Sequence, residues 1–133
     1  MFGVISSDEA IENVKTFLKT RINENDLRPE NAGISITFDG YEMTRTIEWR
    51  DTSIPIQMVV SNIYTLIEFL KNTKPDDIED SADSMKFKYI ERKENYFNET
   101  RELSKIIEID RKNNVVKMYA IMITKDTTVQ SIF

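Results

Sequence analysis

Two stretches of the chain repeat apolar side chains at intervals of three and four residues, the spacing that places them on one face of a helix. The first covers about residues 7–24 and starts with a capping-box sequence at residues 6–9, where a serine hydroxyl accepts from a free backbone amide. The second ends before Pro75. Residues 54–60 fit either its first turns or a separate strand, because a short apolar run suits both.

A different pattern occupies residues 34–49, where apolar and polar side chains alternate on either side of Asp39-Gly40. Alternation is typical of a strand with one buried face, and this dipeptide suits a two-residue hairpin turn. Such a turn pairs Phe38 with Tyr41 and places the apolar side chains of both strands on one inward face. Arg45 interrupts that inward row. Either its stem packs while its charged head reaches the sheet edge, or it faces a ligand.

Three further strands are predicted in the second half of the chain. They cover residues 85–89, 103–110 and 115–123, with a polar turn at 91–95 and a hairpin loop at 111–114. Residues 127–133 either add an edge strand or form a tail. The order α-β-β-α-β-β-β favours a single α+β domain over residues 1–133, with an antiparallel sheet and two helices packed mainly on one face.

The predicted strand at 115–123 is apolar on both of its faces. It is then a central strand of the sheet, or its second face is covered by the C-terminal segment, by a helix or by a neighbouring subunit, because apolar surface is rarely left in water. A central strand is the simplest interpretation and self-association is the next. We therefore expect a homo-oligomer.

The net charge of −5 is concentrated in one segment. Residues 1–75 carry 8 basic and 11 acidic side chains, and residues 85–133 carry 10 and 7, so the two parts cancel. The surplus consists of Asp76, Asp77, Glu79, Asp80 and Asp83. Because their spacing lacks the glycine and late glutamate of a calcium loop, residues 76–84 are predicted to form an acidic surface loop that steers toward a basic protein partner.

The chain contains no histidine and no cysteine, which removes the commonest general bases, nucleophiles and zinc ligands. It also lacks a P-loop, a glycine-rich nucleotide motif and the other short catalytic motifs. Glu42 and Glu48 are the remaining carboxylate pair, but a sequence does not define their separation. We therefore predict that the protein is not an enzyme and needs no metal ion or cofactor.

Positive and aromatic side chains supply the candidate binding residues. For a ligand or a partner they are Arg45, Trp49, Arg50, Lys86, Lys88, Arg92 and Lys93. If they converge, they form a site for a small anionic ligand such as a nucleotide. A further alternative is single-stranded nucleic acid, bound by the basic and aromatic residues of 86–101. Strand alternation opposes it, because Phe87 and Tyr89 then point to the core and only lysines face outward.

By elimination, protein binding is the function class with the most support. We expect a non-enzymatic protein that occupies a protein partner, as an inhibitor, an immunity protein, an adaptor or a viral assembly protein does. The sequence shows neither an export signal nor a membrane-spanning run, so a cytoplasmic, intracellular location is expected. The frequent isoleucine, lysine and asparagine residues suggest a bacterial or phage gene.

Overall fold

A computed structural model describes residues 3–23, 32–40, 42–49 and 57–127. These residues form one sheet and two helices, which confirms the α+β class. The elements are, in chain order, β1 (Val4–Ile5), α1 (Ser7–Lys19), β2 (Ala32–Asp39), β3 (Glu42–Trp49), β4 (Gln57–Val60), α2 (Ile63–Lys71), β5 (Asp77–Asp80), β6 (Ser84–Asn95), β7 (Glu99–Asp110) and β8 (Val115–Asp126).

Strand β8 is the centre of the sheet, as its two apolar faces predicted. Along one side it pairs with β7 over its whole length. Along the other side residues 115–117 pair with β4, and residues 120–126 pair with β3. The described strand pairs are antiparallel except β1 with β4. One long strand therefore joins two different sets of neighbours.

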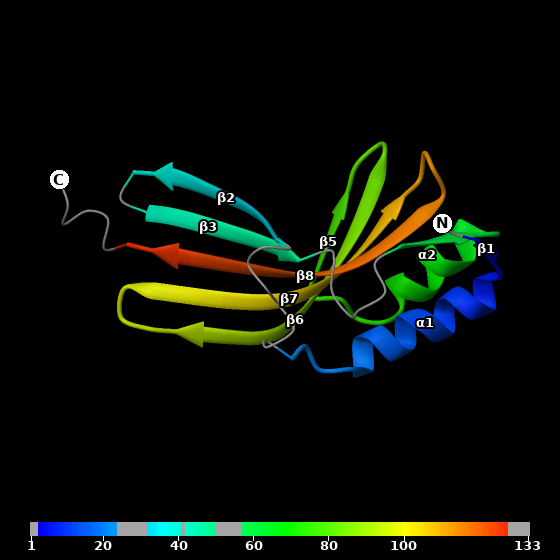
Figure 1. Ribbon diagram of the computed structural model, residues 1–133, viewed down its shortest axis with the longest axis horizontal. Helices are drawn as coiled ribbons and strands as arrows, with labels where there is room; N and C mark the ends of the chain where they lie inside the picture. Colours follow the sequence, from blue (N-terminus) through cyan, green and yellow to red (C-terminus); the bar gives the residue numbers. More distant parts are fainter. Residues whose placement is uncertain (1–2, 24–31, 41, 50–56, 128–133) are drawn as a thin grey trace.

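Both helices pack on the same face of the sheet, near one end of β8 (Figure 1). We call this face the helix-side face and the opposite one the far face. The apolar sides of both helices contact the strands there, because burying their apolar stripes is the main source of helix stability. The core residues are Ala10, Val14, Phe17, Met58, Val60, Ile63, Leu66, Ile67, Leu70, Met85, Phe87, Ile107, Ile109, Val116 and Met118.

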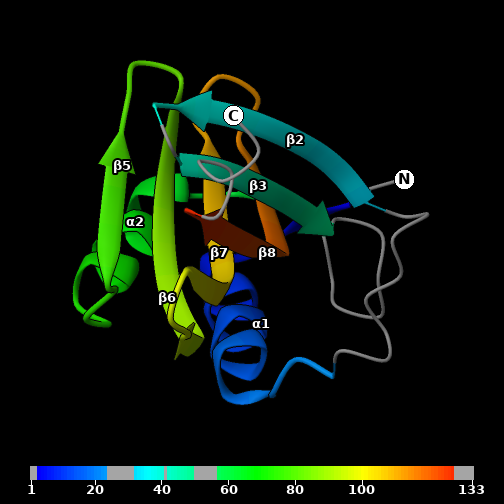
Figure 2. The same cartoon turned by 90° about the vertical axis from the view of Figure 1, so that its left-hand side faces the viewer.

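The other end of the sheet projects beyond the helices (Figure 1). We call this part the extension. It consists of β2, β3, residues 120–126 of β8, residues 99–105 of β7 and residues 90–95 of β6. Viewed end-on, β2 and β5 lie at opposite margins of the sheet (Figure 2). The extension is therefore a five-stranded platform along which neither α1 nor α2 packs.

Helix α1 is shorter than the periodicity predicted, because it ends at Lys19. The carbonyls of Leu18 and Thr20 accept hydrogen bonds from the ammonium of Lys105 on β7, at 3.0 Å for Leu18. A charged donor from the sheet thus satisfies carbonyls that a longer helix would direct to its own amides. The apolar residue that follows, Ile22, packs on the extension instead of continuing the helix.

The predicted turn at 91–95 is wrong, because those residues belong to β6. The register of β6 against β7 shifts between Ile90 and Arg92, which is a β-bulge. The turn lies further on, where the amide of Tyr96 donates to the carbonyl of Glu99 at 2.7 Å. An exposed strand with charged residues on both faces has the same local composition as a polar loop. The sequence of residues 91–95 therefore did not distinguish a strand from a turn.

The first hairpin has the predicted strands but a register two residues away from the expected one. Phe38 lies opposite Met43, and the last pair of the ladder is Asp39 with Glu42. Gly40 takes the positive φ of 60°, so the turn starts at Gly40 rather than at Asp39. A shift of two preserves the side-chain faces, and the apolar residues still share one face.

Two short segments, residues 57–60 and 77–80, form strands. Residues 57–60 form β4, which decides in favour of the strand for the described part of 54–60; residues 54–56 lie outside the described residues. Within the predicted acidic loop, Asp77–Asp80 forms the edge strand β5, although all four residues are exposed. Thr127 donates its amide to the carbonyl of Asn98 at 2.9 Å, and residues 128–133 lie outside the described residues.

The predicted hairpin loop at 111–114 is confirmed, and one carboxylate organises it. Asp110 accepts from the backbone amide of Asn113 at 3.0 Å and from its side-chain amide at 2.8 Å. The side-chain bond is the larger cause that lowers the pKa of Asp110 below its ordinary value. A lowered folded-state pKa adds stability above the unfolded pKa, and this stability disappears as pH falls through the folded pKa.

We expect Asn113→Ala to lower the free energy of unfolding at neutral pH by less than about 1 kcal/mol, because one partly exposed hydrogen bond is lost. The difference in free energy of unfolding between Asn113→Ala and the wild type should become smaller once Asp110 is protonated, because Asn113 then bonds a neutral carboxyl group instead of a carboxylate. Urea midpoints measured between pH 7 and pH 2 test this. A difference that stays constant over that range would show that the carboxylate charge plays no part.

Candidate functional site

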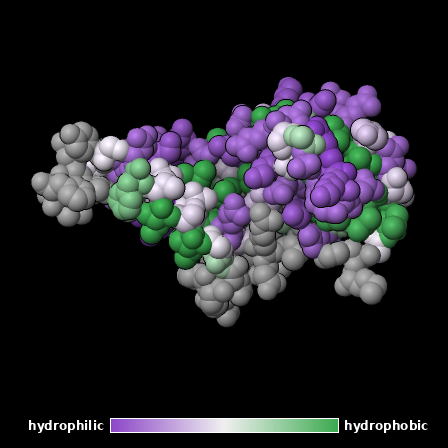
Figure 3. Space-filling model, turned by 90° about the horizontal axis from the view of Figure 1, so that it is seen from above, coloured by the Kyte–Doolittle hydropathy of each residue, from purple (hydrophilic) through white to green (hydrophobic). Residues whose placement is uncertain are grey.

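The helix-side face of the extension carries a row of exposed apolar side chains on β2. Ile34, Ile36 and Phe38 are 55%, 52% and 65% exposed. In the register of the hairpin they lie beside Ile47, Arg45 and Met43 of β3. Figure 3 shows apolar side chains in a line along the extension, next to hydrophilic ones. The row was predicted as an inward face, and it is uncovered by any described residue because the helices pack further along the sheet.

Where the extension meets the helical end, the same face becomes a second core. Trp49, Leu103 and Ala120 are buried there, and Ile22 and Met122 pack against them. Trp49 is 5% exposed, so its ring stabilises the junction rather than the surface. Apolar character therefore continues from a buried junction out to an exposed end.

Arg45 lies in the middle of the exposed row. Its register neighbours are Ile36 on β2 and Thr124 on β8, and Arg101 follows on β7. The side chain of Arg45 is exposed and forms no ion pair with any residue that the structure describes. The hydroxyl of Thr124 is buried and likewise has no hydrogen-bond partner among those residues. The exposed guanidinium of Arg45 is therefore the polar group with unused bonding capacity at the surface here, and the Thr124 hydroxyl lies beneath that surface.

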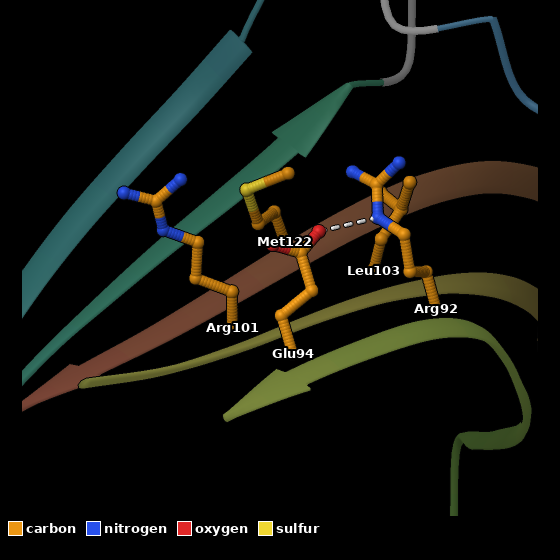
Figure 4. A pocket seen from close by; sticks show the side chains of 5 residues that line it. All are labelled: Arg92, Glu94, Arg101, Leu103 and Met122. Carbon is orange, nitrogen blue, oxygen red and sulfur yellow. Dashed lines mark ion pairs between the residues drawn. The ribbon is translucent and has the colours of Figure 1, made fainter. Parts of the chain in front are cut away.

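A hollow of about 270 Å³ lies on the same face, near the β6–β7 hairpin. Arg92, Glu94, Arg101, Leu103 and Met122 line it, and their side chains rise from β6, β7 and β8 toward the same side of the sheet (Figure 4). Arg92 and Glu94 form an ion pair at 2.7 Å. The hollow is therefore lined by both charged and apolar side chains.

The charges in this hollow largely neutralise one another. The hydroxyl of Tyr96 donates to Glu94, and this bond is the main cause that lowers the pKa of Glu94, with smaller contributions from Arg92 and Arg101. Arg101 donates to Glu99 at 2.5 Å. Since each of these arginines has a carboxylate partner, the hollow has no strong preference for an anion.

The predicted lysines lie on the far face. Lys86, Lys88 and Lys93 project there, opposite Glu108, Ile106 and Glu102 of β7. The ammonium of Lys88 contacts Glu102 at 2.7 Å. The predicted cations are consequently divided: Arg45 and Arg92 are on the helix-side face, and the three lysines are on the other. Arg50 lies outside the described residues.

The far face is also apolar in its centre. The buried Tyr119 of β8 donates its hydroxyl to Glu108 at 2.7 Å. A hollow of about 200 Å³ lies there, lined by Glu48, Asp77, Glu79, Lys86, Lys88, Ile106, Tyr119, Ile121 and Ile123. Acidic and basic side chains alternate around its rim, so it too lacks a uniform charge.

The aromatic residues of the basic stretch do not share a face with the lysines. Phe87 is fully buried in the core and Tyr89 packs against it. Tyr96 and Phe97, which are exposed, lie at the β6–β7 turn. A stacking platform for single-stranded nucleic acid needs rings and cations on one surface, and the strand pattern separates Phe87 and Tyr89 from the lysines. The exposed ring of Tyr96 does lie beside a cation, at 5.7 Å from the guanidinium of Arg101.

The acidic segment is partly occupied by internal bonds. Asp76 accepts from the amide of Ile90 at 2.6 Å, and Asp80 contacts Arg111 at 2.8 Å. Asp77 and Glu79 face Lys88 and Lys86 across the β5–β6 ladder, and Asp83 is exposed. These acids therefore contribute contacts at the β5 edge of the sheet. Their binding to a basic protein partner stays a prediction.

The part of the chain that the structure describes holds no group of three or more acidic side chains arranged to bind a metal ion. Neither α1 nor α2 has the length and apolar character needed to cross a bilayer. Comparison with protein-family models, with curated proteins and with solved structures found no match.

Sequence reasoning missed two contributors to the helix-side face. Arg101 was considered only as part of the basic stretch, because its strand was expected to begin at residue 103. Thr124 lay beyond the predicted end of the last strand at 123. Alternation extended to residue 126 would have indicated Thr124, which follows Ala120 and Met122 on the same face. Extending the preceding strand back from Leu103 would have placed Arg101 on the face of Leu103.

Proposed function

We propose that this is a non-enzymatic protein that acts by occupying a protein partner, and that the helix-side face of the extension is the contact surface. The observation that carries the proposal is the exposed row of Ile34, Ile36 and Phe38 on a platform that no described residue covers. A continuous apolar row of this kind on a folded domain is typical of an interaction site. A cytoplasmic location is part of the proposal.

The surface also indicates the chemistry of the partner. Its centre combines apolar side chains with the exposed guanidinium of Arg45, which forms no ion pair with any described residue. A carboxylate can accept from this guanidinium, and charge-assisted bonds of this type are stronger than neutral ones. We therefore expect a partner segment that presents apolar side chains around an acidic residue.

The two alternative functions stay predictions. A small anionic ligand is less well supported, because the predicted cations lie on two faces and Arg92 and Arg101 have carboxylate partners. Nucleic acid is less well supported, because the rings of Phe87 and Tyr89 are on the core side and the lysines are not.

Site-specific photo-cross-linking tests the proposed surface. A photoreactive residue at Phe38 should give an adduct with a second, different protein in cells of the source organism. The same residue at Tyr64 of α2 or at Phe97 should not, although these positions are 79% and 98% exposed. Ile36→Asp should abolish the Phe38 adduct, because its carboxylate lies beside Arg45 and opposes the acidic residue expected of the partner.

Equal adducts at all three positions would show non-specific contact and would contradict the proposal. An adduct at Phe38 that persists with Ile36→Asp would place the contact elsewhere. Arg45→Gln serves as the test of the partner's chemistry, since it keeps a polar side chain of similar length. We expect it to reduce the yield at Phe38 without changing the fold.

A further inference from the structure

Strand edges present unpaired backbone groups that attract other strands unless short length, charge or a bulge prevents it. Within the described residues β1 has two residues, and β5 carries acids at Asp77, Glu79 and Asp80. The outer half of β6 is bulged near Ile90 and charged over residues 91–94. These edges are therefore protected against pairing.

Strand β2 has none of these protections. It is eight residues long and, among the described residues, pairs only with β3. Its ladder with β3 is regular, it contains no proline, and its one charged residue is Asp39 at the end. A long, regular and almost uncharged edge is maintained in a folded protein when another strand covers it.

The sequence of β2 suits a second copy of itself. Two antiparallel edge strands related by a two-fold axis keep the same face of the sheet toward the same side, so opposite residues have numbers of equal parity. The apolar row of one copy then continues into the apolar row of the other. Pairing with a strand of a different protein does not ensure that the two apolar rows lie on the same face, because the apolar face of that strand is independent of the sequence of β2.

The register centred on Ile36 pairs almost the whole length of β2. With Ile36 opposite Ile36 of the second copy, Ile34 pairs with Phe38 and Ser35 pairs with Thr37. This register aligns residues 33–39 and places Asp39 opposite Gly33, so no like charges meet directly. The two Arg45 side chains lie three strand spacings apart, roughly 14 Å, which exceeds the Debye length of about 10 Å at 0.1 M salt.

We propose that β2 is the interface of a homodimer, in which two copies join edge to edge around Ile36 and form one continuous sheet. The edge and the helix-side face are separate surfaces. A dimer through β2 therefore leaves the helix-side face of both copies available to the proposed partner and doubles it. The purified chain suffices to test the dimer, so its failure is distinguishable from failure of the proposed function.

Single cysteines test the register, because the native chain has none. In Ile36→Cys the two thiols lie directly opposite each other, with Cβ atoms about 5 Å apart, and oxidation should give a covalent dimer. In Ile34→Cys the thiols are offset by four residues, about 13 Å, and should stay reduced. Cross-linking of both at equal rates would overturn the proposed register.

Paired charges test the interface itself. In Ser35→Lys/Thr37→Lys every lysine faces a lysine of the second copy, whereas in Ser35→Lys/Thr37→Glu every lysine faces a glutamate. Both positions are on the exposed far face of β2, so both variants should fold, which circular dichroism checks. The native chain and the Lys/Glu variant should scatter light as particles of twice 15.6 kDa, and the Lys/Lys variant as 15.6 kDa.

A native chain of 15.6 kDa at micromolar concentration, or a Lys/Lys variant that remains dimeric, overturns the dimer. The Lys/Lys variant also separates the two proposals in cells. It should lose the adduct between two copies from Phe38 and keep the adduct with the second protein.

Discussion

Replacing Lys105 with methionine is expected to lower the free energy of unfolding by about 3–5 kcal/mol, the range for removing one member of a buried ion pair. Lys105 is 4% exposed, and its ammonium lies 3.3 Å from Glu91 and donates to the carbonyls of Leu18 and Thr20. Methionine retains most of the stem volume, so the loss comes from the charge and its bonds. The urea midpoint and slope measure it.

The reason for this size is that one ammonium connects three parts of the fold. It ends α1, it lies 5.7 Å from the centre of the Phe17 ring, and it neutralises Glu91 at the bulge of β6. Glu91 in turn accepts from the amide of Ile22 at 3.0 Å. Without the ammonium, a partly buried carboxylate and the last carbonyls of the helix lose their donor.

Two controls separate the network from a general effect of removing a lysine. Lys88→Met breaks the more exposed pair with Glu102 and should cost about 1 kcal/mol or less. Glu91→Gln should cost less in the Lys105→Met background than in the native protein, because the unpaired charge is then already present. Additive losses would mean that Glu91 and Lys105 act independently and would contradict the network.

The second large effect is expected at Phe87. This side chain is fully buried in the core beneath both helices, so Phe87→Ala should lower the free energy of unfolding by about 3–5 kcal/mol through lost burial and a cavity. Phe97→Ala is the matched control, because Phe97 is 98% exposed. It should change stability by no more than about 0.5 kcal/mol.

The pair also bears on nucleic-acid binding. If Phe87 served as a stacking platform, Phe87→Ala would reduce retention on single-stranded nucleic acid at low salt while the fold stayed intact. We expect instead that any loss of binding follows the loss of folded protein. A stable Phe87→Ala variant with weaker retention would therefore support the nucleic-acid alternative against the proposed function.

Local patterns in the chain predicted most of the secondary structure. The capping sequence at Ser6, the alternation around residues 34–49 and the polar loop at 111–114 are short-range signals, and the elements they indicate are present. Errors occurred where neighbours compete with local preference. At the bulge Glu91 pairs with Lys105, and the same Lys105 donates to the carbonyl of Leu18 at the end of α1, so both places involve residues far from Leu18 in the sequence.

The candidate surface was only half predictable. Alternation correctly placed Ile34, Ile36 and Phe38 on one face with Arg45, because the side-chain period of a strand is local. Whether that face is covered depends on where the helices dock. The helices bury the strands around Met118 and stop short of β2, and no local signal contains that information.

The amino-acid chemistry alone sets the class of domain, the two amphipathic helices, the apolar side of the first hairpin and the absence of imidazole and thiol groups, because each is a property of residues close together in the chain. Long-range packing sets the rest. It divides the predicted cations between two faces, buries Lys105 at the end of α1 and leaves β2 with one edge that no described strand pairs, since these outcomes depend on strand order and helix position.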